Sequence, residues 1–199
     1  MNHQQFFDQA AANWDALIEE QTLIRLQAIV SGLDIEPGVA ALDVGCGTGV
    51  LFPMLLRKVG KAGCIVGLDI SGGMLRQTRA KGYPIECVQG DAQSLPLQHR
   101  TFDWVICNAV FPHFPDKLRA LREVRRVLKG GGRLVICHTA SREAVNELHR
   151  AIGGVVAHDT IPSDDEMRRL LREARLDRAV VQDAPDRYVV LARRDDGFA

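Results

Sequence analysis

A glycine-rich segment, Asp43–Gly49, has the residue types and spacing of a ligand-binding turn. It follows a short apolar run typical of a buried strand, and a helical pattern begins near Val50. Glycine has no side chain and adopts positive φ, so backbone amides in such a turn can approach a ligand closely. Asp43 places a carboxylate beside the turn, where it would repel a pyrophosphate and attract a cation. The segment predicts a site for a ligand with a positive centre.

Two further carboxylates follow predicted strands. Asp69 ends the apolar run Ile65–Asp69, some twenty residues after the glycine turn, where a carboxylate can accept hydrogen bonds from both hydroxyls of a ribose. Dinucleotide-binding enzymes use the same device, but the position of their third glycine is Val50 here. Asp91 follows the next strand and can accept from the exocyclic amine of adenine. Together these residues favour an uncharged nucleoside that bears a cation over NAD or ATP.

Alternating strands and helices must position these residues. Short apolar runs alternate with amphipathic stretches, which is the pattern of strand–helix units around a mostly parallel sheet. The expected strands are Ala40–Val44, Cys64–Asp69, Pro84–Val88, Phe102–Cys107 and Arg133–His138, with a final pair at Leu176–Gln182 and Arg187–Ala192. In such a sheet ligands bind at the carboxyl ends of the strands, where the candidate residues lie.

Helices are expected between the strands. Ser71 should cap a helix that runs to Lys81. Another helix should open at Asp116 and end at Gly130–Gly132. The remaining expected helices lie near Arg142–Ile152, from Pro162-Ser163 to Arg175, and as two helices within about Gln4–Leu33.

The motifs occur in the order found in class I S-adenosylmethionine-dependent methyltransferases. The chain resembles that family over roughly Ala40 to His138, through Asp43–Gly49, Asp69, Gly90–Ala92, Phe102-Asp103 and Leu128–Gly132. The segment from Phe6–Asp8 to Asn13–Asp15 is similar to the N-terminal lid of small-molecule methyltransferases of the ubiquinone/menaquinone-biosynthesis type. The resemblance implies an α/β fold with a doubly wound, Rossmann-like, seven-stranded and mostly parallel sheet whose last strand is antiparallel. It also implies S-adenosyl-L-methionine as the cofactor.

By position in those motifs, the resemblance implies roles for individual residues. The implied cofactor-binding residues are Asp43, Gly45, Cys46, Gly47, Asp69, Ile70, Met74, Asp91, Ala92 and Asn108. The two glycines would line the methionine portion, and Asp69 would hold the ribose. Ile70 and Met74 would pack on the adenine, whose edge the Asp91-Ala92 pair would read, and Asn108 would lie beneath the methionine moiety. Met74 also fits a plain core position of its helix.

His113 is the candidate catalytic residue. It lies in the segment Asn108–Asp116, which faces the methyl acceptor in this family, at a position where many members have histidine. As a general base it could take a proton from an O–H, N–H or S–H acceptor. A histidine that only caps the loop by a hydrogen bond explains the pattern equally well. Methyl transfer from a sulfonium needs mainly in-line placement, so a strong base is not required.

The expected substrate and lid residues are Phe7, Trp14, His138 and Arg142. The two aromatic residues lie seven apart on a predicted helix, so both can face the same pocket. His149 and His158 add to the histidines in the half of the chain that would meet the acceptor. A histidine-lined pocket for a metal- or metalloid-bearing acceptor is one interpretation. No tight ligand spacing such as HxxxH occurs, which favours scattered surface histidines, and no metal site is expected.

Composition excludes several other classes of protein. The 199 residues hold 25 Lys+Arg and 25 Asp+Glu, so the basic footprint of a nucleic-acid binder is missing. No apolar stretch is long enough to cross a bilayer, and Met1–Asp8 does not resemble a signal peptide. We therefore expect a cytoplasmic location without a membrane or nucleic-acid partner. Five scattered cysteines without a CxxC pair fit reduced core thiols.

These observations lead to one main interpretation with two alternatives. We expect a helical lid at residues 1–36 and one compact cofactor-binding domain at residues 37–199, which methylates a small-molecule acceptor. The alternatives are an NAD(P)-dependent oxidoreductase and a catalytically silent S-adenosylmethionine-binding regulatory or assembly protein. The sequence leaves open the identity of the acceptor, the atom that is methylated and whether the protein forms a homodimer.

Overall fold

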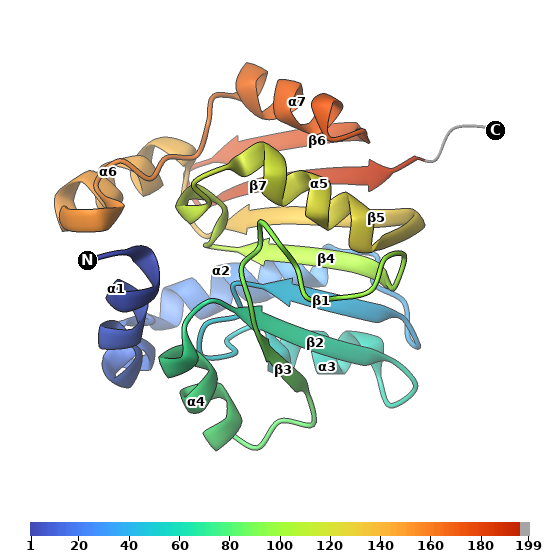
Figure 1. The fold of residues 1–199 in the computed structure, drawn as a ribbon, viewed down its shortest axis with the longest axis horizontal. Coiled ribbons are helices and arrows are strands. Elements are labelled where there is room, and N and C mark those ends of the chain that lie inside the picture. Colours follow the sequence, from blue (N-terminus) through green and yellow to red (C-terminus); the bar gives the residue numbers. More distant parts are fainter. Residues whose placement is uncertain (196–199) are drawn as a thin grey trace.

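The computed structural model describes residues 1–195 and contains one seven-stranded sheet flanked by helices (Figure 1). The strands are β1 (Ala40–Val44), β2 (Cys64–Asp69), β3 (Glu86–Gln89), β4 (Phe102–Asn108), β5 (Leu128–His138), β6 (Leu176–Ala184) and β7 (Arg187–Arg194). Their spatial order is β3-β2-β1-β4-β5-β7-β6, and β7 runs antiparallel to both of its neighbours while the other pairs are parallel. The expected mostly parallel sheet with an antiparallel last strand is confirmed.

The central strands are continuous apolar runs because helices cover both faces of the sheet. Residues 41–44 of β1 and 104–107 of β4 are all buried. β1 pairs in parallel with β2 on one side and with β4 on the other, so the strand order reverses between β1 and β4. Open α/β sheets bind ligands at such a reversal, beyond the carboxyl ends of the strands.

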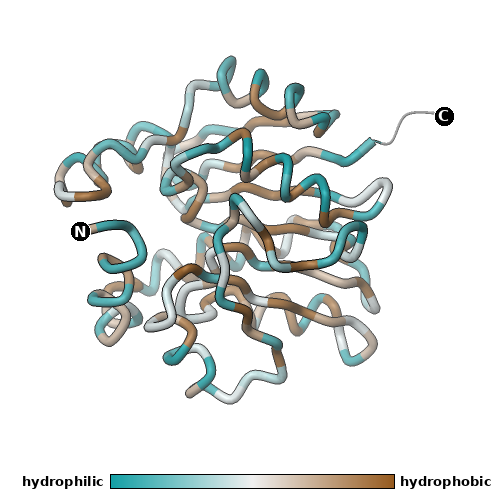
Figure 2. The backbone as a smooth tube through the Cα atoms, viewed as in Figure 1, coloured by the Kyte–Doolittle hydropathy of each residue, from teal (hydrophilic) through white to brown (hydrophobic). Residues whose placement is uncertain are grey.

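Two layers of helices enclose the sheet. The main helices are α2 (Glu20–Ser31), α3 (Phe52–Val59), α4 (Gly72–Ala80), α5 (Lys117–Val127), α6 (Arg142–Ile152) and α7 (Asp164–Glu173). Apolar residues of α2 and α3 form one buried cluster behind the sheet of Figure 1, and those of α5 and α7 form another with the opposite face. In Figure 2 the apolar colours follow the strands, and polar colours alternate with them along the helices. Within residues 1–195 no helix has the length and apolar character needed to cross a bilayer.

Side-chain caps explain where the helices begin. The Ser71 hydroxyl accepts a hydrogen bond of 3.0 Å from the Met74 amide at the start of α4. The Asp116 carboxylate accepts one of 2.9 Å from the Arg119 amide at the start of α5. Each cap satisfies an amide that has no partner within its helix. Both predicted helix starts are confirmed.

The predicted end of α5 is wrong. The helix ends at Val127, and Gly130–Gly132 belong to β5 rather than to a helix stop. Opposite this part of β5 the register shifts, because Phe102 pairs with Leu128 and Trp104 with Arg133. The extra residues form an irregular bulge, in which glycine is favoured because it tolerates close packing and positive φ.

The predicted bounds of four other strands also differ, and in β4 the difference is one residue, since the strand ends at Asn108. β3 begins at Glu86 instead of Pro84, since proline lacks the N–H that a ladder position needs. β6 and β7 extend to Ala184 and Arg194, beyond the predicted ends. The antiparallel pairing of these two strands lengthens both of them, and a two-residue turn at Pro185-Asp186 joins them as expected.

The N-terminal stretch divides into two structurally different parts. α1 (His3–Ala10) is followed by the 3-10 helix η1 (Ala11–Leu17), and we call residues 3–17 the lid segment. Phe7 and Trp14 therefore do not share one α-helix as predicted, yet their rings contact edge-to-face at 5.7 Å. The expected lid boundary after residue 36 groups α2 with the lid segment. The apolar face of α2 is instead buried in the core beneath the sheet.

Candidate functional site

A cavity of about 320 Å³ lies at the carboxyl ends of β1, β2 and β4. Its walls include every residue expected to bind the cofactor: Asp43, Gly45, Cys46, Gly47, Asp69, Ile70, Met74, Asp91, Ala92 and Asn108. Phe7 and Trp14 of the lid segment and His113 also line it. In Figure 1 α1 lies near the arrowheads of β1 and β4, and residues of α1 line the cavity. One space thus gathers residues that are far apart in the sequence.

The glycine turn between β1 and α3 brings bare backbone to the cavity. Gly45 and Gly47 have φ values of +71° and +54°, which glycine adopts without strain. A Cβ atom on Gly45 would lie 2.3 Å from the Val110 side chain, so no other residue fits there. At Gly47 the nearest atom to such a Cβ would be Nε1 of Trp14 at 4.0 Å. Gly47 therefore leaves room for a ligand between the turn and the lid segment.

Asp43 is a buried carboxylate without a hydrogen-bond partner. The residue is 1% exposed, and neither of its carboxylate oxygens is paired within the described chain. Burial, and secondly the charge of Asp69, raises the pKa of Asp43 to about 8. An unpaired charge in the interior is unfavourable unless another group compensates it. Because Asp43 lines the cavity, a cationic group of a ligand is the partner that this position requires.

Asp69 connects the glycine turn to the start of α4. One carboxylate oxygen accepts from the Gly47 amide and the other from the Ser71 amide, both at 2.8 Å. Burial raises the pKa of Asp69, although these two hydrogen bonds act in the opposite direction. An ionised carboxylate offers about four acceptor positions. Asp69 therefore keeps acceptor capacity for donors inside the cavity, such as ribose hydroxyls.

The wall next to Asp69 combines one polar edge with apolar side chains. The Asp91 carboxylate lies in the loop after β3 and accepts a hydrogen bond of 2.8 Å from the Gln93 amide. Ile70 and Met74 line the cavity from the start of the β2–α4 connection and from α4, and Met74 is 2% exposed. A flat heterocycle with polar edges suits such a wall.

The chain leaves β4 through a strained residue. Ala109 has a φ of +52°, which is unusual for a residue with a Cβ atom, and its amide donates to the Cys137 carbonyl at 2.9 Å. The side-chain oxygen Oδ1 of the neighbouring Asn108 lies 3.6 Å from Sγ of Cys137. Such conformations cluster at functional sites, where the surrounding structure holds them. This turn directs the chain toward His113.

Asp8 fastens the lid segment to α4. Its carboxylate accepts hydrogen bonds of 2.7 Å from the Ser71 hydroxyl and from the Gly73 amide. The hydrogen bonds from Ser71 and Gly73 lower the pKa of Asp8. A carboxylate at a helix N-terminus is favourable because the unpaired amides there carry partial positive charge. Gly73 permits the close approach, since a Cβ atom there would lie 3.0 Å from the Asp8 carboxylate.

Asp15 fastens the other end of the lid segment to the glycine turn. It accepts a hydrogen bond from the Thr48 hydroxyl and lies 2.7 Å from the Lys81 ammonium. Although burial acts in the opposite direction, the hydrogen bonds from Lys81 and Thr48 lower the pKa of Asp15. The lid segment is thus attached on both sides of the cavity by charged groups rather than by a deep apolar core.

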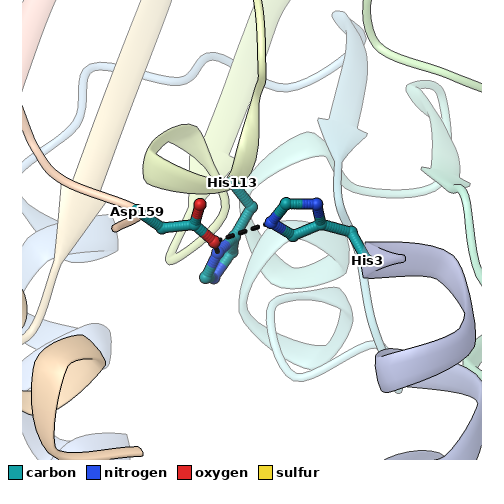
Figure 3. Close-up of side chains that lie close together, drawn as sticks. All are labelled: His3, His113 and Asp159. Atoms are coloured by element: carbon teal, nitrogen blue, oxygen red, sulfur yellow. Dashed lines mark hydrogen bonds and ion pairs between the residues drawn. The ribbon is translucent and has the colours of Figure 1, made fainter. Parts of the chain in front are cut away.

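His113 forms a compact polar cluster with residues from two other segments. Nδ1 of His113 and Nε2 of His3 lie 2.7 and 2.8 Å from the same carboxylate oxygen of Asp159 (Figure 3). The rings of Phe7 and His149 pack around His113, with centroids at 5.1 and 4.8 Å. Burial lowers the pKa of His113, while the hydrogen bond to Asp159 raises it. The cluster lies at the wall of the cavity formed by the lid segment and the loop after β4.

Two predicted substrate residues, His138 and Arg142, do not line the cavity. His138 is 4% exposed at the end of β5, where it pairs with Tyr188 of β7, and burial lowers the pKa of its ring to about 3. Arg142 is the first residue of α6, and its side chain lies 4.0 Å from the Asp183 carboxylate. Strand pairing and the departure of α6 from the sheet carry both side chains away from the cavity. The remaining predicted site residues lie around it.

Four residues of the site were not predicted from the sequence as functional: His3, Asp8, Asp15 and Asp159. Asp8 and Asp15 end the two lid motifs, so their pattern was visible but their contacts were not. Asp159 has no local motif, and it meets His113 across 46 residues and His3 across 156. Only the folding of α6 and the turn after it brings Asp159 to His3 and His113, which line the cavity.

Comparison with known proteins finds a matching domain family and several relatives. A methyltransferase domain model matches residues 42–136. A curated relative, the demethylmenaquinone methyltransferase of Staphylococcus epidermidis, is 38% identical over 124 residues, which are 61% of this chain and 52% of that protein. The chain spans about half the length of most of the curated relatives it matches, and about a third of one of them.

Solved structures share the fold across nearly the whole chain. A chain of the complex that contains the Haloferax volcanii Trm112 methyltransferase activator has a TM-score of 0.81 at 21% identity, covering 95% of this chain and 97% of that chain. An S-adenosylmethionine-dependent methyltransferase from Aquifex aeolicus has a TM-score of 0.74 at 23% identity, covering 92% and 98%. The domain match over residues 42–136, the ordered motifs and the sheet topology together support a class I S-adenosylmethionine-dependent methyltransferase.

Proposed function

We propose that the protein transfers a methyl group from S-adenosylmethionine to a small-molecule acceptor. The observation that carries the proposal is the unpartnered, fully buried carboxylate of Asp43 at the wall of the cavity. S-adenosylmethionine carries an α-ammonium and a sulfonium, and its adenosine portion is uncharged. Such a ligand compensates a buried carboxylate, whereas the pyrophosphate of a dinucleotide would be repelled by it.

The residues around Asp43 fit the rest of the cofactor. Gly47 leaves open space beside the turn for the methionine portion. Asp69 retains acceptor positions for the two ribose hydroxyls, and such charge-assisted hydrogen bonds are strong. Ile70 and Met74 offer apolar surface for the adenine. The edge of the adenine would meet the Asp91-Ala92 segment, and Asn108 would lie beneath the methionine moiety.

The chemistry that this arrangement performs is a displacement at the methyl carbon. A lone pair on the acceptor forms the new bond to carbon, and the electrons of the carbon–sulfur bond return to sulfur. The positive charge of the sulfonium is lost in the step, so the leaving group needs no acid. Holding the acceptor in line with the carbon–sulfur bond supplies most of the acceleration.

On the acceptor side we assign the catalytic role to His113. It lines the cavity from the loop after β4 and faces Phe7 of the lid segment at 5.1 Å between ring centroids. Phe7 and Trp14 close the same side with aromatic surface. The acceptor is therefore a small molecule with an apolar part that stacks on these rings and a heteroatom or acidic carbon near His113.

The alternatives are weaker for specific reasons. An oxidoreductase that binds NAD(P) would have to hold a pyrophosphate beside Asp43, and Val50 stands where the third glycine of its turn is needed. A silent binding protein would have no use for a histidine cluster and aromatic groups at the acceptor side of the cavity. We further propose a cytoplasmic protein that works on free metabolites without a nucleic-acid or membrane partner, as a monomer or a homodimer.

The test combines binding with group transfer. The purified protein should bind S-adenosylhomocysteine in a calorimeter, and Asp69→Ala should weaken binding by about 1.5–3 kcal/mol, or roughly 10–150-fold, because charge-assisted hydrogen bonds are lost. Tritium from methyl-labelled S-adenosylmethionine should then appear in one component of a metabolite extract. Binding without transfer would indicate the silent binding protein, and binding of NADH instead would indicate the oxidoreductase.

A further inference from the structure

Three segments that are remote in the sequence converge on one point beside the cavity. His3 comes from α1, His113 from the 3-10 helix η2 (Phe111–His113), and Asp159 from the turn after the 3-10 helix η3 (Gly154–Val156). One nitrogen from each ring and one oxygen of Asp159 all lie within 4.8 Å of one another (Figure 3). The side chains of His3, His113 and Asp159 are 25%, 11% and 13% exposed. The point of convergence is therefore sheltered but reachable.

The donor set is that of a transition-metal site. Two imidazoles and one carboxylate bind Zn²⁺ and other first-row divalent ions, and catalytic sites of this kind keep further positions open. With metal–ligand bonds of about 2.0–2.2 Å, tetrahedral donor atoms lie about 3.3 Å apart. The present separations include 2.7 and 2.8 Å from Asp159 to the two rings. All three donor atoms lie within 4.8 Å of one another, so ion binding requires them to adjust to that spacing.

A second observation shows that the turn carrying Asp159 is held in place from behind. The backbone carbonyl of Asp159 accepts a hydrogen bond of 2.7 Å from Nδ1 of His149, which is buried on α6. On the same helix Asn146 binds both the amide and the carbonyl of Ile161, at 2.8 and 3.1 Å. Metal sites depend on such outer contacts to orient their ligands. The hydrogen bonds from His149 and Asn146 thus hold the turn that carries Asp159 in place.

The nearby positive charge of Lys117 does not occupy the site. Its ammonium donates to the backbone carbonyls of Pro112 and Phe114, at 3.0 and 3.2 Å. Among the contacts of the described chain, the Asp159 carboxylate is shared by the two histidines. One carboxylate and two imidazoles form a donor set that a divalent cation can enter.

We propose that His3, His113 and Asp159 bind a divalent first-row transition-metal ion, represented by Zn²⁺. The ion joins the lid segment to the loop after β4, because His3 and His113 lie on those two elements. The sequence alone predicted no metal site, since the three ligands have no common local spacing. An ion bound to Nδ1 of His113 leaves the proton on Nε2, so in the metal-bound protein His113 serves as a ligand and not as the proton acceptor.

The position of the ion suggests its use, and this consequence rests on the proposed function. His3 and His113 both line the cavity, so the open coordination positions face the space for the acceptor. An acceptor hydroxyl or thiol bound to the ion loses its proton to water more readily. The freed lone pair then forms the bond to the methyl carbon, and the carbon–sulfur bond pair returns to sulfur.

The metal site is tested by direct titration rather than by activity. The full-length protein is stripped with a chelator, dialysed and titrated with ZnCl₂ in a calorimeter, with Co²⁺ added in parallel to record its visible absorption. We expect one ion per chain. Asp159→Asn keeps the shape and a hydrogen-bond acceptor but removes the anionic ligand, so it should weaken binding about 10–100-fold, as should His3→Gln on the lid segment. His99→Gln, on an exposed turn, is the matched control and should bind like the parent.

Each contrary result overturns the proposal. No binding by the parent protein, equal binding by Asp159→Asn and His3→Gln, or an equal loss in His99→Gln would show that the cluster is only a hydrogen-bonded one. Circular dichroism of each variant checks that it is folded, and His3→Gln changes a side chain outside the core. Failure of the proposed function is separate: a protein that binds Zn²⁺ at this site but binds no S-adenosylhomocysteine would keep the metal site and lose the methyl-transfer assignment.

Discussion

At the level of single residues, the two neighbouring carboxylates of the cavity, Asp43 and Asp69, differ in their hydrogen bonds. Asp69 accepts two backbone hydrogen bonds, whereas both oxygens of Asp43 are unpaired. The pKa of Asp43 is accordingly raised to about 8. At pH 7 the Asp43 side chain of the unliganded protein therefore carries about 0.9 of a proton on average. The ligand decides whether this residue is charged.

Cofactor binding should therefore release a proton. The ammonium of S-adenosylhomocysteine favours the ionised form of Asp43, so at pH 7 binding should liberate up to about 0.9 proton, and less above pH 9. Calorimetry in two buffers of different ionisation enthalpy measures this number. Asp43→Asn should bind without release, because the amide has no proton to lose. Identical heats in both buffers for the parent protein would contradict the assignment of Asp43.

His113 is the residue whose loss should affect turnover but not cofactor binding. It contacts Asp159 and Phe7, whereas Asp69 binds the Gly47 and Ser71 amides and has no hydrogen bond to His113 within the described chain. His113→Ala should lower kcat by about 10²–10⁴-fold and leave the affinity for S-adenosylhomocysteine nearly constant. Steady-state kinetics and calorimetry on the same sample give both values.

The control for this prediction is His99→Ala, which changes an exposed histidine that does not line the cavity. It should leave kcat and affinity unchanged. If His113→Ala kept a kcat close to that of the parent, the reaction would proceed by placement alone, and His113 would only shape the loop.

At the scale of elements, the lid segment stands apart from the rest of the fold. α1 buries none of its residues, and η1 buries only Ala11 among the described residues. Polar contacts of Asp8, Asp15 and His3 hold it instead. The pKa values of both aspartates are lowered in the folded protein. These two contacts therefore stabilise closure above the ordinary carboxyl pKa of about 4 and are lost as the pH falls below it.

Removing the lid segment should separate turnover from binding. Deletion of residues 1–19 should leave a folded protein, because α2 and the sheet keep their apolar contacts. Turnover should fall more than the affinity for S-adenosylhomocysteine, since Phe7, Trp14 and His3 line the acceptor side. Circular dichroism, calorimetry and kinetics on the shortened protein measure the three quantities. Full activity after deletion would refute a role for the lid segment in catalysis.

At the scale of the whole molecule, the cavity lies between elements from both halves of the sheet. The glycine turn follows β1, Asp69 ends β2, and Asn108 ends β4, so the cavity is lined by residues at the ends of three neighbouring strands. Ligand binding to the folded state alone stabilises it by mass action. Because these strands form the centre of the sheet, that stabilisation should appear in global unfolding.

S-adenosylhomocysteine should therefore raise the thermal midpoint. At a concentration of 100 times Kd the gain is about 2.7 kcal/mol, which for a chain of this size corresponds to roughly 5–11 °C in Tm. Scanning calorimetry measures the shift, and NADH at the same concentration is the control that should give none. A shift with NADH and none with S-adenosylhomocysteine would reverse the choice between methyltransferase and oxidoreductase.

Sequence patterns alone predicted the seven-stranded sheet and the bounds of the strands Ala40–Val44 and Cys64–Asp69. They also predicted which residues lie at the carboxyl ends of the strands. Local patterns suffice there, because apolar runs specify buried strands and glycine specifies the tight turn. The prediction of a helix end at Gly130–Gly132 was wrong, because a glycine run suits a bulged strand as well as a helix end. Only the pairing with β4 distinguishes the two cases.

The residues around the proposed acceptor space could be identified only from the tertiary structure. His138 was predicted to be a substrate residue because it lies in the half of the chain that would meet the acceptor, yet pairing with β7 places it in the core. Asp159 gave no local signal, and it meets His3 and His113 only after α6 and the lid segment have packed. Patterns of two or three residues encode strands and turns because those contacts are local. Contacts between residues 3, 113 and 159 depend on loop paths and packing that no local pattern records.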